Sequence, residues 1–162
     1  MLKINIKQID NVGTDFIGSI SPKELGIDIS LKNDDIEITK EVQYNLHISS
    51  LNGDILVMGE VKVPVKAECG RCVSLYEFQH VIDDTCHFFE DIRGDYIDIA
   101  PELREDILLK LPSKYLCSEK CKGVCPICGI NLNKNECKCE QEEETTFDEE
   151  TNFWGELDKL DL

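Results

Sequence analysis

The sequence has little positive charge and no long apolar run. Its 162 residues include 17 lysines and arginines against 33 aspartates and glutamates, which gives a formal net charge of −16. A surface this acidic repels a phosphate backbone over most of its area, so broad electrostatic docking on nucleic acid is disfavoured and basic proteins are the more natural partners. No stretch approaches the roughly 20 apolar residues of a transmembrane helix, so we expect no membrane partner.

Signals for secretion and for common enzyme classes are also missing. The first residues, MLKINIKQIDNVGTDF, alternate polar and apolar side chains and include acids, so we expect no signal peptide and a cytoplasmic location. The sequence contains no G-x-S-x-G motif, P-loop or G-x-G-x-x-G fingerprint. Its histidines, His47, His80 and His87, form no motif, and we expect each to be structural. These absences predict a protein that is not an enzyme and has no small-molecule substrate.

Cysteine, in contrast, is abundant. The chain has nine cysteines, and the segment 117–139, CSEKCKGVCPICGINLNKNECKC, holds most of them. Cytoplasmic thiols stay reduced and an odd number of them argues against a disulfide framework. A redox C-x-x-C pair normally stands at a helix N-terminus beside a βαβ pattern, whereas Cys69 and Cys72 lie between two expected strands with acids nearby. Metal binding is therefore the preferred interpretation.

Most of the cysteines form close pairs with the spacing of zinc ligands. A C-x-x-C turn holds two thiolates at the separation that a tetrahedral zinc site needs, and a structural zinc takes four such ligands. Exchanged pairings stay open, as does a single zinc with the other thiols free, because pairing between distant cysteines cannot be deduced from sequence. The remaining residue, Cys86, shares the apolar phase of its strand, and we expect it to be buried. Sequence proximity favours two zinc sites, one formed by Cys125, Cys128, Cys137 and Cys139 and the other by Cys69, Cys72, Cys117 and Cys121.

Two alternating runs predict a β-hairpin. Residues 36–48 and 55–67 each alternate apolar and polar side chains, which is the period of a half-buried strand. Asn52 and Gly53 stand between them and suit a type I′ turn, in which both central residues have positive φ. If Leu51 pairs with Asp54, every apolar side chain falls on one face. This register places opposite each other Ile48 and Val57, Tyr44 and Val61, and Val42 and Val63.

The rest of the chain adds further strands and one helix. Residues 75–89 alternate, with a possible break at Asp83 and Asp84, and the N-terminal LKINIKQI predicts an additional strand. Residues 100–111 change to a helical period, with Pro101 in the first turn and Pro112 as the stop. The expected fold is α+β, mainly an antiparallel β-sheet with one packed helix and a C-terminal zinc-ribbon-like element.

Composition divides the chain into three regions. Residues 1–116 are expected to form the antiparallel β-sheet domain, residues 117–139 the zinc-binding element, and residues 140–162 an acidic tail with a short amphipathic end around Trp154, Leu157 and Leu160. Only the cysteine-rich segment is net basic. A local contact with nucleic acid therefore stays open there. Its lysines are Lys120, Lys122, Lys134 and Lys138.

Residues 50–139 resemble the YceD family, the large ribosomal RNA subunit accumulation proteins, in its cysteine-rich form. The features that carry the resemblance are CGRC at 69–72, YID followed by LREDILLKLP, and LCSEKCKGVCPICGINLN ending in CKC. The resemblance implies a non-enzymatic factor in ribosome biogenesis, needed for normal levels of large-subunit ribosomal RNA and associated with a small ribosomal protein of that subunit. The family's tail usually carries an Asp-Pro-Arg-like stretch, which FDEETNFWGELDKL lacks.

These observations combine into one hypothesis and two alternatives. The basic zinc-bound segment contacts ribosomal RNA or a large-subunit assembly intermediate, while the acidic flanks hold a basic ribosomal protein, because complementary charge speeds encounter and blocks wrong contacts. The first alternative is a general zinc-ribbon protein interaction module, for example in transcription, with no ribosomal connection. The second is a redox enzyme.

Overall fold

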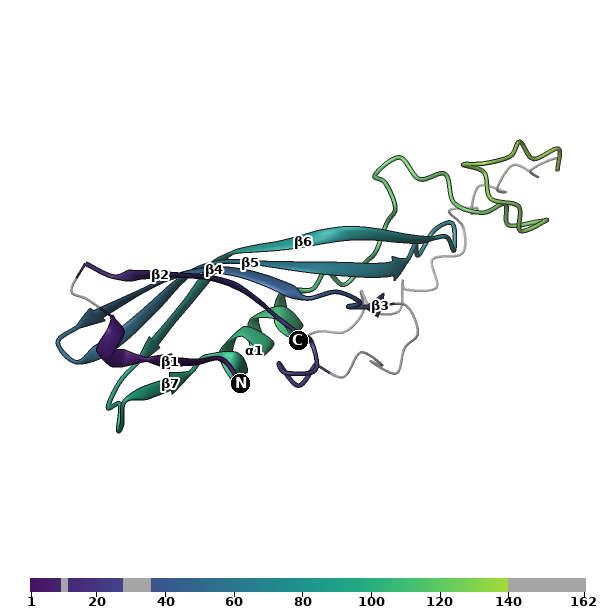
Figure 1. Cartoon of the computed structure of the whole chain (residues 1–162). Helices are drawn as coiled ribbons and strands as arrows, with labels where there is room; N and C mark the ends of the chain where they lie inside the picture. The colour runs from purple at the N-terminus through teal and green to yellow at the C-terminus, as the bar shows by residue number, and fades with distance from the viewer. Residues whose placement is uncertain (10–11, 28–35, 140–162) are drawn as a thin grey trace, which may run out of the picture.

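The structure, a computed structural model, describes residues 1–9, 12–27 and 36–139, so the expected acidic tail over 140–162 lies outside the described residues. A five-stranded antiparallel sheet dominates the described part, and the α+β class predicted from sequence is confirmed (Figure 1). Its strands are β2 (Thr14–Ile20), β3 (Ile36–Glu37), β4 (Val42–Leu51), β5 (Asp54–Glu68) and β6 (Leu75–Phe89).

Short elements complete the fold beside the sheet. At the N-terminus, where a longer strand is expected, β1 (Lys3–Asn5) is followed directly by a 3-10 helix, η1 (Ile6–Gln8). β1 pairs antiparallel with β7 (Tyr96–Asp98), which leads into α1 (Ala100–Lys110). No helix within the described ranges is long and apolar enough to cross a membrane.

The β4–β5 hairpin has the predicted turn and register. Asn52 and Gly53 have φ values of 55° and 98°, as a type I′ turn requires. Leu51 pairs with Asp54, and the register continues through the predicted pairs Ile48–Val57 and Tyr44–Val61. The single strand expected over 36–48 is interrupted, because the chain leaves the ladder between β3 and β4 and β3 pairs with the far end of β5.

One face of the sheet is buried against α1. In Figure 1 the helix crosses that face beneath the long strands. Leu103 and Ile107 of α1 are both 0% exposed. Each fully buried side chain of this size stabilises the fold by about 1.5–3 kcal/mol. The sheet contributes Val42, Leu46 and Ile48 from β4 and Ile55, Val57, Val61, Val63, Val65 and Ala67 from β5. This core runs along the whole β5 strand.

A β-bulge in β6 reverses the burial expected for its second half. Val61 pairs with Ile82, whereas Gly59 pairs with Thr85, so β6 contains one residue more than β5 across this step. Thr85 therefore takes the inward position, and Cys86 is exposed. The prediction that Cys86 is buried is wrong. The alternation of inward and outward side chains changes phase at Asp83 and Asp84, where the sequence also indicated a possible break in the strand.

The sequence pattern does not predict β2. Its residues TDFIGSI show no alternation, and Ile17 is 77% exposed. β2 nevertheless pairs with β4 along its whole length, from Thr14 opposite Ile48 to Ile20 opposite Val42. Gly18 allows this packing because the ring of Tyr44 crosses the strand there, and a Cβ would lie 2.5 Å from the Tyr44 hydroxyl oxygen.

The bulge generates a prediction for Gly59. A Cβ at this position would lie 2.1 Å from the carbonyl oxygen of Asn45 and 2.8 Å from Cα of Leu46, and neither backbone atom can rotate away. Gly59→Ala is expected to lower the free energy of unfolding by about 3 kcal/mol in urea titrations. Gly53→Ala is the control, because its Cβ meets nothing within 4 Å and only its φ of 98° opposes the change. The control should cost about 1 kcal/mol, and equal losses would contradict the role of the close approach.

Candidate metal centre

The turn between β5 and β6 forms the first cysteine knuckle and collects the chain that follows α1. The N–H of Val73 donates to the carbonyl of Cys69 at 2.9 Å and closes the turn. The N–H of Gly70 donates to the carbonyl of Tyr115 at 2.9 Å. The N–H of Cys117 donates to Sγ of Cys69 at 3.4 Å. These contacts bring a segment that is distant in sequence to the tip of the hairpin.

Four sulfur atoms meet at this tip and form what we call the first cysteine group. The Cys69 and Cys121 sulfurs are 3.8 Å apart, and those of Cys72 and Cys117 are 3.6 Å apart. Sulfur atoms around a tetrahedral ion with metal–sulfur bonds of about 2.3 Å are about 3.8 Å apart, so the spacing fits such an ion. The Sγ atoms of Cys69, Cys72, Cys117 and Cys121 all lie within 4.8 Å of one another.

The second cysteine group lies in the segment that projects beyond the tip of the hairpin, drawn in yellow-green in Figure 1. Its knuckle repeats the first, because the N–H of Gly129 donates to the carbonyl of Cys125 at 2.8 Å. The Cys137 sulfur lies 3.3 Å from that of Cys125 and 3.5 Å from that of Cys128. The Sγ atoms of Cys125, Cys128, Cys137 and Cys139 all lie within 4.8 Å of one another.

The structure brings together the same two sets of four cysteines that sequence proximity favours. Each group can hold a metal ion, since four thiolates at tetrahedral spacing are a complete ligand set. One isolated β-bridge, between Val124 and Asn131, lies in the segment, which is compatible with a zinc-ribbon-like element. Cys86 belongs to neither group.

Hydrogen-bond donors favour the thiolate form at some cysteines of both groups, and the Ser74 hydroxyl and N–H lower the pKa of Cys72. Burial raises the pKa of Cys69, but N–H donors from Cys117, Arg71 and Cys72 outweigh burial and lower this pKa to about 6. Donors from the backbone of the second knuckle lower the pKa of Cys125 to about 7.

Other cysteines of the same groups resist ionisation. Hydrogen bonds with the sulfurs of neighbouring cysteines raise the pKa of Cys117 to about 12, and the same cause raises the pKa of Cys139 to about 12. Four thiolates at these distances repel one another, so they ionise together only around a cation. The electrostatics of both groups therefore suit a divalent metal.

Two asparagines that the sequence patterns did not single out support the first group. Nδ2 of Asn133 donates to Sγ of Cys121 at 3.3 Å. Nδ2 of Asn131 donates to the carbonyl of Cys72 at 3.3 Å and to the Ser74 hydroxyl at 3.0 Å. The repeated asparagine in GINLNKNE was the available signal, but asparagine is common in ordinary turns.

The surface around the groups combines lysines with exposed apolar side chains. Val73 is 61% exposed, Leu75 64% and Ile127 59%. Within the part of the chain that the structure describes, the lysines of this segment form no ion pair, and neither do Lys3, Lys23 and Lys114. The lysines of the segment are Lys120, Lys122, Lys134 and Lys138, and the lysines with an ion pair are Lys7, Lys40, Lys62, Lys66 and Lys110.

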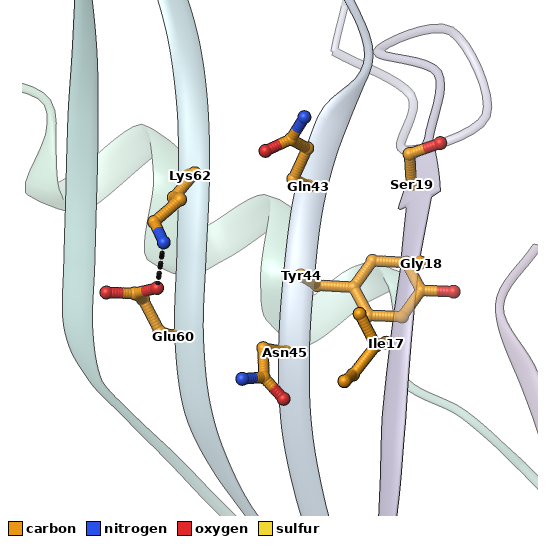
Figure 2. Close-up of a pocket in the computed structure, with 8 residues that line it drawn as sticks. All are labelled: Ile17, Gly18, Ser19, Gln43, Tyr44, Asn45, Glu60 and Lys62. Atoms are coloured by element: carbon orange, nitrogen blue, oxygen red, sulfur yellow. Dashed lines mark ion pairs between the residues drawn. The ribbon is translucent and has the colours of Figure 1, made fainter.

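A shallow cavity of about 470 Å³ lies elsewhere, on the sheet, and Figure 2 shows its lining. Glu60 and Lys62 pair with each other at 2.6 Å, and burial raises the pKa of Tyr44. No cysteine or histidine lines this cavity. Its lining residues are Ile17, Gly18, Ser19, Gln43, Tyr44, Asn45, Glu60 and Lys62.

Two of the histidines make contacts with acids outside both cysteine groups. His87 Nε2 lies 2.8 Å from Asp106 Oδ2, a contact that ties β6 to α1. His47 Nδ1 lies 2.6 Å from Asp15 Oδ1, which links β4 to β2. Neither ring is placed to complete a metal site.

The fold and the site define a class of protein: an α+β protein with an antiparallel sheet whose longest hairpin carries one group of four cysteines at its tip, followed by a second such group in the C-terminal segment. The family described as large ribosomal RNA subunit accumulation protein YceD matches residues 77–161, which is more than half of the chain. The chain belongs to the YceD family, as the resemblance over residues 50–139 predicts. The family's name ties it to the accumulation of the large ribosomal RNA subunit.

Individual relatives match over shorter stretches. The large ribosomal RNA subunit accumulation protein YCED homolog 1 of Arabidopsis thaliana, a chloroplastic protein, is 38% identical over 61 residues, which cover 38% of this chain and 18% of that protein. A Mycobacterium tuberculosis protein described as uncharacterized is 28% identical over 129 residues, covering 69% of this chain and 59% of the relative. YlbN of Bacillus subtilis, also described as uncharacterized, is 31% identical over 94 residues, covering 54% and 51%. The matched stretches thus span less than two thirds of each relative, and no solved structure matches.

The two knuckles differ at the residue after their second cysteine. Val73 has a φ of 55° and Gly129 a φ of 71°, in the left-handed region that costs a non-glycine residue about 1–2 kcal/mol. Val73→Gly is expected to raise the free energy of unfolding of the metal-loaded protein by about 0.5–1 kcal/mol, because relief of this strain exceeds the backbone entropy of glycine. Gly129→Val should lower it. Denaturant titration measures both, and a destabilised Val73→Gly variant would contradict the strained turn.

Proposed function

We propose that this chain is a zinc-binding, non-enzymatic factor of ribosome biogenesis that supports accumulation of large-subunit ribosomal RNA. The observation that carries the proposal is the convergence of eight cysteines into two four-sulfur groups in a member of the YceD family. The family name and the description of the Arabidopsis thaliana relative both refer to the large ribosomal RNA subunit, and the proposal names this RNA on that basis. The cytoplasm, where thiols stay reduced, is the compartment that suits such a protein.

Zn²⁺ is the ion that we assign to both groups. Soft thiolate ligands in a tetrahedral set are typical of zinc. One ion would be held by Cys69, Cys72, Cys117 and Cys121, and the other by Cys125, Cys128, Cys137 and Cys139. Four thiolates leave no open coordination position, so a bound ion would cross-link the chain and supply no reactive site.

Three regions divide the work in this proposal. Residues 1–116 provide the scaffold, with a hydrophobic core under the full length of β5. Residues 117–139 form the zinc-bound element, whose four lysines make no ion pair with a carboxylate of the described residues and are available to ribosomal RNA or to a large-subunit assembly intermediate. A basic ribosomal protein is held through complementary charge by residues 140–162, which are rich in aspartate and glutamate, and by the other acidic residues that flank the cysteine-rich segment.

A non-catalytic role is supported by the composition of the sites. The four sulfurs of each cysteine group would fill every coordination position of a tetrahedral ion. The cavity on the sheet is lined by one ion pair, a tyrosine and neutral side chains. Ser19 of that lining donates its hydroxyl to the Glu41 carboxylate, but no histidine or cysteine lines the cavity. Binding, not bond-making, is the activity that these surfaces suit, and no small-molecule substrate is proposed.

The exposed apolar side chains favour a second candidate function, a general zinc-ribbon protein interaction module. Val73, Leu75 and Ile127 are all more than half exposed near the groups, and such side chains become anchors in protein interfaces. Crosslinking in cells separates the two candidates. Recovery of large-subunit ribosomal RNA supports the proposal, while recovery of transcription proteins without ribosomal RNA supports the alternative.

Metal content provides the first test. We expect two zinc ions per chain by elemental analysis after reconstitution with excess zinc under reducing conditions and removal of unbound ion. Cys72→Ser and Cys128→Ser should each lower the ratio by about one, because each removes a ligand from a different group. Cys86→Ser is the matched control and should leave the ratio unchanged, since Cys86 is an exposed cysteine outside both groups. A wild-type chain without zinc, whose thiols react at once with and without chelator, would contradict the assignment.

The RNA contact provides the second test. Replacing Lys120, Lys122, Lys134 and Lys138 by glutamine should reduce co-sedimentation with large-subunit precursors and flatten its salt dependence, because fewer phosphate contacts release fewer counterions. Lys3→Gln with Lys23→Gln is the control, as these exposed lysines lie far from the segment in sequence. Co-sedimentation that is unchanged in the fourfold variant and in high salt would contradict electrostatic contact through these lysines.

A further inference from the structure

Side chains that lie inside the second cysteine group's loop hold the first cysteine group. Asn131 and Asn133 stand between the knuckle Cys125–Cys128 and the close pair Cys137–Cys139. Their side chains nevertheless point to the first group. The loop that closes around one candidate ion is therefore the support of the other.

Asn133 contacts the first group at Cys121, which lies in the segment after α1. Its Nδ2 donates to Sγ of Cys121 at 3.3 Å, and its Oδ1 accepts from the N–H of Lys122 at 2.9 Å. Asn133 thus fixes the direction of the Cys121 ligand.

Asn131 contacts the same group at Cys72, in the turn between β5 and β6. Its Nδ2 donates to the carbonyl of Cys72 at 3.3 Å and to the Ser74 hydroxyl at 3.0 Å. Its Oδ1 accepts from the N–H of Asn133 at 2.9 Å and from Nδ2 of Asn133 at 3.1 Å. The two side chains form one clamp that joins the β5–β6 knuckle to Cys121.

Backbone contacts align the two groups as well. The N–H of Val124 donates to the carbonyl of Arg71 at 3.1 Å, and the N–H of Leu132 donates to the carbonyl of Gly123 at 3.0 Å. A Cβ on Gly123 would lie 3.2 Å from the Arg71 carbonyl oxygen, so the two segments approach closely there. The first knuckle is therefore packed directly against the strand-like start of the second group's loop.

The clamp depends on closure of its own loop. Within this loop the N–H of Cys125 donates to the carbonyl of Ile130 at 2.8 Å, and no helix or strand lies in it. A short exposed loop of this kind loses conformational entropy when it is fixed, at roughly 1–2 kcal/mol per residue. An ion bound by Cys125, Cys128, Cys137 and Cys139 would restrict the loop. Less conformational entropy would then be lost when Asn131 and Asn133 form their hydrogen bonds to the first group.

We infer that the two metal sites are positively coupled through Asn131 and Asn133. Occupancy of the second group fixes the asparagine clamp and raises the affinity of the first group. Thermodynamic linkage requires that the first group raises the affinity of the second by the same factor. The element then exists mainly with no ion or with both. This inference rests on the proposed metal binding and adds a dependence between the sites.

Native mass spectrometry at one zinc ion per reduced full-length chain tests the coupling directly. Coupled sites should populate the zero-ion and two-ion forms above the one-ion form. Independent sites of unequal affinity would instead make the one-ion form dominant, and that outcome would overturn the inference while leaving the proposed zinc sites intact. A chain that binds no zinc would contradict the proposed zinc-binding function, and this outcome is distinguishable from a dominant one-ion form.

A thermodynamic cycle tests the clamp itself. Zinc affinity of the first group is measured by competition with a chromophoric chelator. Asn133→Ala should weaken it about 10–100-fold, the usual effect of removing a side chain that orients a metal ligand. Asn135→Ala is the matched control, because Asn135 is exposed in the same loop and its side chain forms no hydrogen bond with any described residue.

The same cycle needs a chain without the second site. Cys137→Ser with Cys139→Ser should weaken the first group about 10-fold or more, within the usual range of coupling between sites. In that background Asn133→Ala should have little further effect, since the clamp is already loose. Fully additive losses would overturn the clamp as the route of coupling.

A spectroscopic readout separates ligand positioning from loss of fold. In the chain loaded with cadmium-113, Asn133→Ala should shift one of two metal resonances, because it removes a hydrogen bond to one ligand sulfur. Asn135→Ala should shift neither. Equal spectra for Asn133→Ala and wild type would contradict the Asn133–Cys121 contact.

Discussion

The meeting of sulfur atoms at the end of the β5–β6 hairpin is the constraint on which the C-terminal part of the structure depends. The sheet has its own core, in which Val61, Val63 and Val65 are buried against other apolar side chains, and the buried cysteines form a separate cluster. Beyond α1 the situation is different, because no further helix or strand follows within the described residues. The path of residues 117–139 is set by the cysteines and by hydrogen bonds to the knuckle at Cys69.

The long hairpin turns this local constraint into a positioned surface. β5 and β6 each run for 15 residues and pair along nearly their whole length, so their tip is an extension of the hydrophobic core and not a loose loop. The first cysteine group is built on that tip, with Cys69 and Cys72 largely buried. The second group is attached to the first through Val124 and the asparagine clamp, and it therefore inherits the orientation of the sheet.

Sequence patterns predicted the features that local chemistry decides. The register of the β4–β5 hairpin followed because the Asn52–Gly53 turn and the alternation agreed, and the close cysteine pairs followed from their short spacings. The association of Cys69 and Cys72 with the distant pair Cys117 and Cys121 was only one of the pairings that the sequence left open. Features decided by distant partners were missed. The exposure of Cys86 depends on a bulge opposite Gly59, and β2 is placed by its pairing with β4, where the ring of Tyr44 crosses Gly18. The clamp likewise joins Asn131 to Cys72 across 59 residues, which no local pattern reveals.

The charge of the two proposed metal centres limits how the proposed RNA contact can work. A divalent ion with four thiolates would carry a formal charge of about −2, so two such centres would more than offset the net positive charge of the segment. Long-range attraction of RNA is therefore weak, and contact relies on individual lysine side chains that reach beyond the sulfurs. Shape and short-range contacts must then supply most of the selectivity. This requirement favours a segment that is rigid when it meets its partner, and two coupled cross-links provide more rigidity than one.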